Sequence, residues 1–139
     1  MDMKELKNKL RSAYWADRKL RKDVEYLDSL RSTAESVSGM QYDKIAVKGG
    51  LHASKIEQAA VALVVCEDTV RADMEQLRDA LQTVDKYISC LDGLREQTIM
   101  RSRYQLFEPW ERIAADTGYT WQHVHRLHKA ALHEIASKM

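Results

Sequence analysis

Histidines gather near the end of this chain, where they could bind a metal ion. Four of the five histidines are His123, His125, His128 and His133. A zinc site usually needs four protein ligands, or three and a water molecule. No cysteine or carboxylate lies at a matching spacing, and the side chains of His123 and His125 diverge on a helix. The pattern therefore predicts no metal site.

Side chains that could carry out catalysis do not form a recognisable set. The sequence has no nucleophile combined with a base and an orienting acid, and no paired carboxylate motif. Gly49-Gly50 lacks the lysine and the Ser/Thr of a phosphate-binding loop. Cys66 and Cys90 lie within helical patterns, which is typical of reduced, buried thiols. We therefore expect neither enzymatic activity nor a cofactor.

The distribution of charge singles out the C-terminal segment. The chain has 22 basic and 21 acidic residues, a net charge of +1, which is unlike the strongly basic balance of many nucleic-acid binders. Residues 99–139 hold six basic and four acidic residues together with four histidines. This segment alone combines a positive balance with side chains that can gain charge. No apolar run approaches the ~20 residues of a membrane span, so we expect no membrane partner.

Two long helices are predicted before this segment. The first carries an apolar residue every seven positions, at Leu6, Ala13, Leu20, Leu27 and Ala34. The second carries a similar series at Ile56, Leu63, Val70, Leu77, Val84 and Leu91. Ser54 and Glu57 form a capping box, which predicts a helix from Lys55 to about Cys90. A loop is expected between the two helices, at about residues 37–53.

The length of the second helix indicates that it packs against another helix. At 1.5 Å per residue it would be ~54 Å long, whereas a compact globule of this size has a radius of gyration of only roughly 14 Å. We expect it to pair with the first helix, with a second chain, or with both. The first pairing gives a coiled-coil-like hairpin, and the second makes the chain a homo-oligomer, with a dimer favoured.

The C-terminal segment contains signals for two short helices and a turn. Pro109 suits the first turn of a helix over about 109–117, because that turn needs no amide donor. Gly118 suits the left-handed conformation that ends a helix. Thr120 is a natural N-cap for a further helix from Trp121 to about Ser137.

The spacing around Gly118 favours a helix-turn-helix over a plain helical hairpin. Ala114 is small where the last helix would cross, Gly118 makes the turn, and Val124 and Leu127 would pack beneath Ile113. A hairpin can share the glycine but seldom all of these constraints together with the cap. The predicted fold class is therefore all-α, with a long helical hairpin followed by a C-terminal helix-turn-helix.

The stretch from L-D-G-L-R-E-Q-T-I-M-R-S-R-Y to P-W-E-R-I-A-A-D-T-G-Y-T-W-Q-H-V-H-R-L-H-K-A-A-L resembles region 4 of bacterial sigma factors. It is more similar still to the phage- and prophage-encoded ArpU/RinA-like transcription regulators. The resemblance covers about Leu91–Leu132 and is looser before that. It implies a helical dimerisation region at 1–90 and a DNA-binding domain at 91–139. We do not expect sigma activity, because no segment resembles the region that melts promoter DNA.

The same resemblance implies which residues contact DNA. In such domains the residues at the start of the last helix face the major groove. In this chain the corresponding residues are Thr120, Trp121, Gln122, His123, His125 and Arg126. Gln122 has the chemistry to bind an adenine edge, and Arg126 that to bind a guanine edge. Lys129 and Arg112 are better suited to hold phosphates. For each of these residues the alternative is an exposed polar residue of a packing helix.

The leading hypothesis is a sequence-specific DNA-binding transcriptional regulator, phage-encoded and acting as a homo-oligomer in the cytoplasm of a bacterial host. Its expected partners are double-stranded DNA and, as a further candidate, RNA polymerase. One alternative is a helical protein-interaction module whose helix-turn-helix does not bind DNA. Another is the DNA-recognition subunit of a phage packaging machine.

Overall fold

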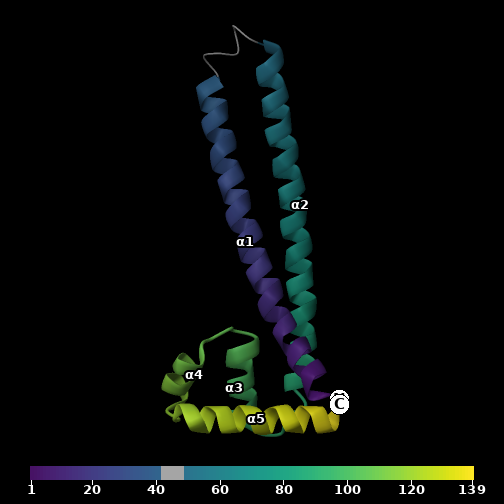
Figure 1. The fold of residues 1–139 in the computed structure, drawn as a ribbon, viewed down its shortest axis with the longest axis vertical. Coiled ribbons are helices and arrows are strands. Elements are labelled where there is room, and N and C mark those ends of the chain that lie inside the picture. Colours follow the sequence, from purple (N-terminus) through teal and green to yellow (C-terminus); the bar gives the residue numbers. More distant parts are fainter. Residues whose placement is uncertain (42–48) are drawn as a thin grey trace. The chain divides into compact units, whose positions relative to one another are not determined.

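The computed structural model describes residues 1–41 and 49–139, and within them the side chains outside 37–54. These residues form α1 (Met3–Gln41), α2 (Gly49–Ile88), α3 (Leu94–Tyr104), α4 (Trp110–Thr117) and α5 (Trp121–Lys138), drawn in Figure 1. The described residues contain no strand. The prediction of an all-α protein is confirmed.

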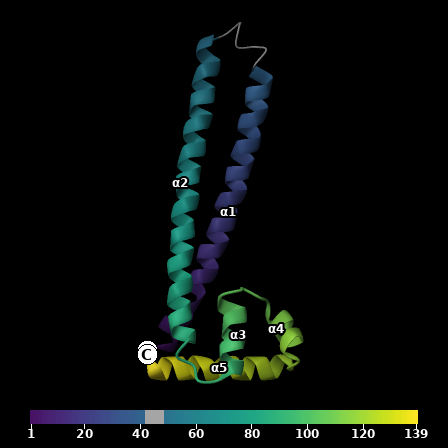
Figure 2. The same cartoon turned by 180° about the vertical axis from the view of Figure 1, so that it is seen from behind.

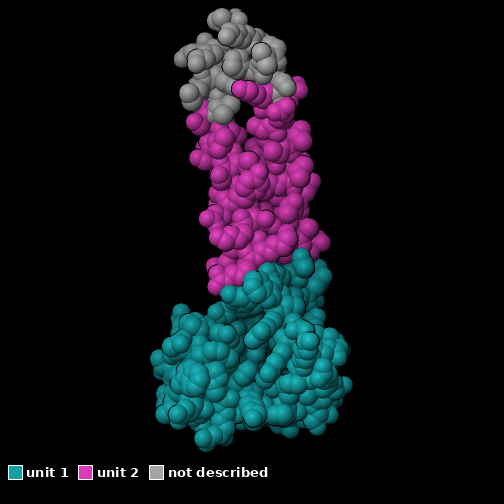
Figure 3. All heavy atoms as spheres, in the orientation of Figure 1, with its two compact units in different colours: residues 1–17, 76–139 teal, residues 18–75 magenta. Residues whose placement is uncertain are grey.

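The described chain divides into two compact units, coloured separately in Figure 3. Unit 1 comprises residues 1–17 and 76–139, and unit 2 comprises residues 18–75. Each long helix contributes to both units. The boundary between the compact units therefore falls within both long helices.

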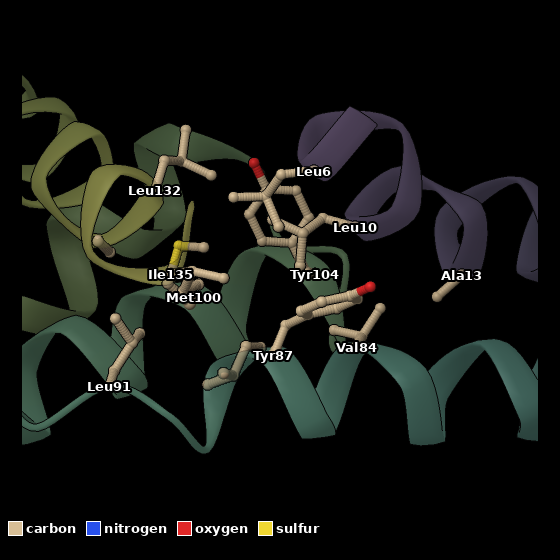
Figure 4. Close-up of a cluster of buried hydrophobic side chains, with 12 residues drawn as sticks. Leu6, Leu10, Ala13, Val84, Tyr87, Leu91, Met100, Tyr104, Leu132 and Ile135 are labelled. Atoms are coloured by element: carbon tan, nitrogen blue, oxygen red, sulfur yellow. The ribbon is translucent and has the colours of Figure 1, made fainter. Parts of the chain in front are cut away.

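The core of unit 1 explains where this division falls. Leu6 and Leu10 of α1, Val84 of α2 and Ile135 of α5 are fully buried in one apolar cluster, shown in Figure 4. Burial of each such side chain contributes about 1.5–3 kcal/mol. The beginning of α1 and the end of α2 are thus part of the same core as α5, a contact between segments far apart in sequence.

Unit 2 is an antiparallel pair of helices with little core. Lys19 Nζ lies 2.6 Å from Asp73 Oδ1, and Arg31 pairs with Glu67 at 3.3 Å. Among the apolar side chains described in this unit, Leu27 and Cys66 are the buried ones. Two helices cover only a narrow strip of each other's surface, so the seven-residue apolar series is only partly buried here.

The helix boundaries differ from those predicted around the loop. α1 continues to Gln41, and α2 already begins at Gly49. Ser54 therefore lies inside α2, and the prediction that it caps the helix was wrong. Glycines are tolerated in the first turn, where amides have no intrahelical partner. The remaining part of the predicted loop, residues 42–48, lies outside the described residues. α2 ends at Ile88, two residues before the predicted Cys90.

Candidate nucleic-acid interface

α4 and α5 are joined by a tight turn at Gly118. This residue has φ 74° and ψ 8°, and its N–H donates to the carbonyl of Ala114 at 3.0 Å. Pro109 lies just before α4, in an extended conformation. The predicted role of Gly118 is confirmed, because it follows from a local backbone preference. Pro109 is the N-cap of α4 and not a residue of its first turn, so that prediction was wrong by one residue.

The beginning of α5 is capped by Thr120. Its hydroxyl oxygen accepts a hydrogen bond from the backbone N–H of His123 at 3.1 Å, as the sequence predicted. Such a cap typically contributes about 1 kcal/mol. The hydroxyl oxygen of Thr120 is thus already engaged within the protein, and α5 starts at Trp121 with a defined direction.

The inner face of α5 is anchored to α3 and α4, which lie on the same side of it in Figures 1 and 2. Val124 and Leu127 form a buried cluster with Ile113 of α4 and Ile99 of α3. The predicted packing of Val124 and Leu127 with Ile113 is confirmed. Because these side chains occupy one face of α5, the opposite face is free for other contacts.

That opposite face carries a row of exposed polar residues. Gln122, Arg126, Lys129 and His133 are all exposed, and their spacing of four, three and four residues aligns them along one side of α5. The row brings together three of the predicted contact residues. It places Lys129 one turn from Arg126 on the same side of α5. His133 was not among the predicted residues, although the same spacing could have identified it.

Arg112 lies on α4, away from this row in sequence. Its Nε is 3.7 Å from Asp116 Oδ2, and both side chains are more than half exposed. An exposed pair of this kind contributes at most about 1 kcal/mol. The guanidinium can therefore exchange Asp116 for another anion at little cost.

The two predicted histidines do not extend freely from α5. His123 is half-buried, and its ring packs edge-on against Tyr119, with the centroids 4.7 Å apart. The ring of His125 lies 3.9 Å from that of Trp121 and 4.5 Å from that of Trp110. The Nε2 atom of His125 is buried, and no described group hydrogen-bonds to it. The structure thus separates these rings from the row that contains Arg126.

Several contacts near this surface had no signal in the sequence. The guanidinium carbon of Arg103 lies 4.6 Å from the Trp110 ring centroid, and its Nη1 donates to the carbonyl of Glu108 at 3.0 Å. Tyr104 pairs with His128. These contacts join α3, α4 and α5, so spacing within any one helix could not have predicted them.

The described residues hold no group of three or more His, Cys, Asp or Glu side chains that could bind a metal ion. None of the described helices is both long and apolar enough to cross a membrane. Comparisons with models of protein families, with curated proteins and with solved structures found no match for this chain.

Proposed function

We propose that this protein is a sequence-specific DNA-binding transcriptional regulator that reads the major groove with α5. The observation that carries the proposal is the exposed row Gln122, Arg126, Lys129 and His133, on a helix whose other face is anchored to α3 and α4. A helix exposed along one side and fixed along the other can enter a groove without rearranging its own fold.

The side chains in this row have the chemistry to bind base edges. The guanidinium of Arg126 can donate two parallel hydrogen bonds to guanine, and the amide of Gln122 can both donate to and accept from adenine. Lys129 supplies a point charge for phosphate. The turn at Gly118, with its φ of 74°, also fits a helix-turn-helix. The near-neutral charge of the whole chain argues against DNA binding. The exposed side chains of α5 and the turn before it are more specific evidence, and they support a DNA-reading role.

The resemblance to ArpU/RinA-like regulators supports a phage-encoded protein that acts in a bacterial cytoplasm, with RNA polymerase as a further candidate partner.

The test of DNA binding and regulation has two stages. Duplexes enriched by the protein from a randomised library are first measured by gel shift, and the enriched sequence is then placed before a reporter gene. Failure to enrich any sequence would favour the interaction-module alternative. Enrichment without any effect on the reporter would favour a packaging role.

The proposal includes a homo-oligomer formed through unit 2. Val61, Val64 and Val65 of α2 are each more than half exposed. Exposed valines contribute little to the stability of a helix, because the β-branched side chain loses rotamer freedom there. Burial of these valines against a second copy of the chain would stabilise the assembly. Leu63 and Leu77, which belong to the seven-residue apolar series of α2, are already half-buried in the single chain.

The valine surface suggests a specific test of the oligomer. Val61→Lys together with Val65→Lys should convert an oligomer into a monomer, as measured by light scattering. The matched control is Asp79→Lys, which makes the same change of two charges at an exposed position of α2 outside the valine surface and removes no apolar side chain. A wild-type protein that stays monomeric at high concentration would rule out the oligomer.

A further inference from the structure

Trp121 is a large apolar side chain left exposed at the beginning of α5. It is the first residue of the helix, and 54% of its surface is exposed. Its ring rests on His125 at 3.9 Å, with the ring planes inclined by 47°. Packing within unit 1 therefore covers only part of the indole surface, and the remaining part is open to contact with a partner.

The indole is held in place by a continuous series of contacts. His125 lies 4.5 Å from Trp110, and Trp110 lies 4.6 Å from the guanidinium of Arg103. We call these four residues, Arg103, Trp110, His125 and Trp121, the aromatic series. It links α3, α4 and α5 and ends at the exposed indole. A side chain that is already ordered loses little conformational entropy when it binds a partner.

The chemistry of the indole limits what it can recognise in a DNA groove. It carries no charge and has a single N–H donor, so it is a poor ligand for phosphate compared with Arg126 or Lys129. Its main contribution is a rigid apolar surface. In the major groove only thymine, among the four bases, presents an apolar group, the C5-methyl.

We propose that Trp121 is a specificity-determining residue that selects thymine by contact with its C5-methyl group. This inference rests on the DNA-binding function proposed above. The aromatic series fixes the indole at the end of α5, while Gln122 and Arg126 supply hydrogen bonds to neighbouring base edges. Trp121 thereby adds recognition of a methyl group, which neither of those polar side chains can bind through a hydrogen bond.

Deoxyuridine provides a direct test, because it pairs like thymidine and lacks only the methyl group. In a duplex enriched by the wild-type protein, each thymine is replaced in turn by deoxyuridine. We expect about fourfold weaker binding at one or two positions, which corresponds to one methyl group of about 0.8 kcal/mol. Trp121→Ala should bind the thymine and deoxyuridine duplexes equally at those positions. The control Gln122→Ala should keep the wild-type ratio between them.

The possible outcomes separate this inference from the proposed function. If the wild-type protein enriches a duplex but is insensitive to every deoxyuridine, the inference is wrong and DNA binding stands. If Trp121→Ala keeps the wild-type ratio, another residue contacts the methyl group, which also overturns the inference. If the indole instead stacks on unpaired bases, the protein should bind single strands with no dependence on the methyl group. If no duplex is enriched, the DNA-binding function itself fails. The wild-type scan requires no substitution, and Trp121→Gln provides a second variant if the alanine variant does not fold.

Discussion

The hydroxyl of Tyr104 lies 2.7 Å from Nε2 of His128 and joins α3 to α5 within the core of unit 1. The two rings are also stacked, with their centroids 5.8 Å apart. Burial, together with the nearby His125 and Arg103, lowers the pKa of His128 to about 4. The imidazole is therefore neutral near pH 7, and its Nε2 shares one hydrogen bond with the tyrosine hydroxyl.

This arrangement should make unit 1 less stable in mild acid. The unfolded histidine takes up a proton near its ordinary pKa of 6.5, whereas the folded one does so only at about 4. The stability that the neutral ring contributes is thus complete above pH 6.5 and is lost as the pH falls towards 4. The loss should be on the order of 3 kcal/mol. Urea unfolding at several pH values measures it, and His128→Gln should remove most of this dependence, whereas the exposed His133→Gln should retain it.

Phe107 has a left-handed backbone, with φ of 58°, between α3 and α4. Its half-buried ring packs against the unit 1 core, with its centroid 6.0 Å from that of Tyr14. Phe107→Ala and Phe107→Gly both remove these contacts, but only glycine adopts a positive φ without strain. We expect the glycine variant to be more stable than the alanine variant by roughly 1 kcal/mol in chemical denaturation. An alanine variant of equal or greater stability would contradict the argument from strain.

Asp73 is a buried carboxylate in the seam of unit 2, with 3% of its surface exposed. Oδ1 pairs with Lys19, and no described group hydrogen-bonds to Oδ2. Burial raises the pKa of Asp73, and the neighbouring carboxyl of Asp23 raises it further. The charged form of Asp73 therefore lowers stability, and this cost declines as the pH falls below the folded pKa of Asp73 and is gone below its ordinary value of 3.8.

Lys19→Met should for this reason destabilise unit 2 in a pH-dependent way. Near pH 7 it leaves the buried charge of Asp73 without its partner, at a cost in stability that is moderated because Lys19 itself is half exposed. The cost should shrink in mild acid, where Asp73 can take up a proton. Thermal unfolding at pH 7 and pH 4.5 measures the difference. Lys22→Met, which removes only an exposed pair with Glu25, should have little effect at either pH.

Substitutions of Gly118 test how much the turn depends on backbone conformation alone. A Cβ atom at this position would meet no other atom within 4 Å, so a substitution there has no steric clash with its surroundings. The cost arises from the φ of 74°. Gly118→Val should lower both thermal stability and DNA binding, whereas Gly118→Asn should cost less, because asparagine tolerates the left-handed region. Equal effects of the two variants would indicate that φ is not the cause.

Arg126 and Lys129 should affect DNA binding differently, although they share the exposed row. Arg126→Ala should weaken binding to the enriched duplex by about 1–3 kcal/mol and change binding to random DNA much less. Lys129→Ala should weaken both alike and reduce the slope of affinity against salt by about one phosphate contact. Gel shifts at several salt concentrations distinguish the two effects. An unchanged ratio of specific to random binding in Arg126→Ala would show that this residue does not read a base.

The sequence by itself determined the features that depend on a few neighbouring residues. The turn at Gly118, the cap at Thr120 and the packing of Val124 and Leu127 with Ile113 were all predicted, because glycine, a capping hydroxyl and apolar spacing act over one or two helical turns. The capping box at Ser54 shows the limit of such signals. α2 continues through it to Gly49, because a local cap does not prevent the preceding residues from being helical.

Only the tertiary structure decided which surfaces of these helices remain free. Leu6 of α1 is buried in the same apolar cluster as Ile135 of α5. The ring of His125 lies close to the indole of Trp110 from α4. In both cases the neighbour comes from another helix, and spacing within α5 does not identify it. Asp73 is buried and Val65 is exposed on the same helix, although residue type alone suggests the opposite. Burial depends on what packs against each face, and helical periodicity defines the faces without identifying their neighbours.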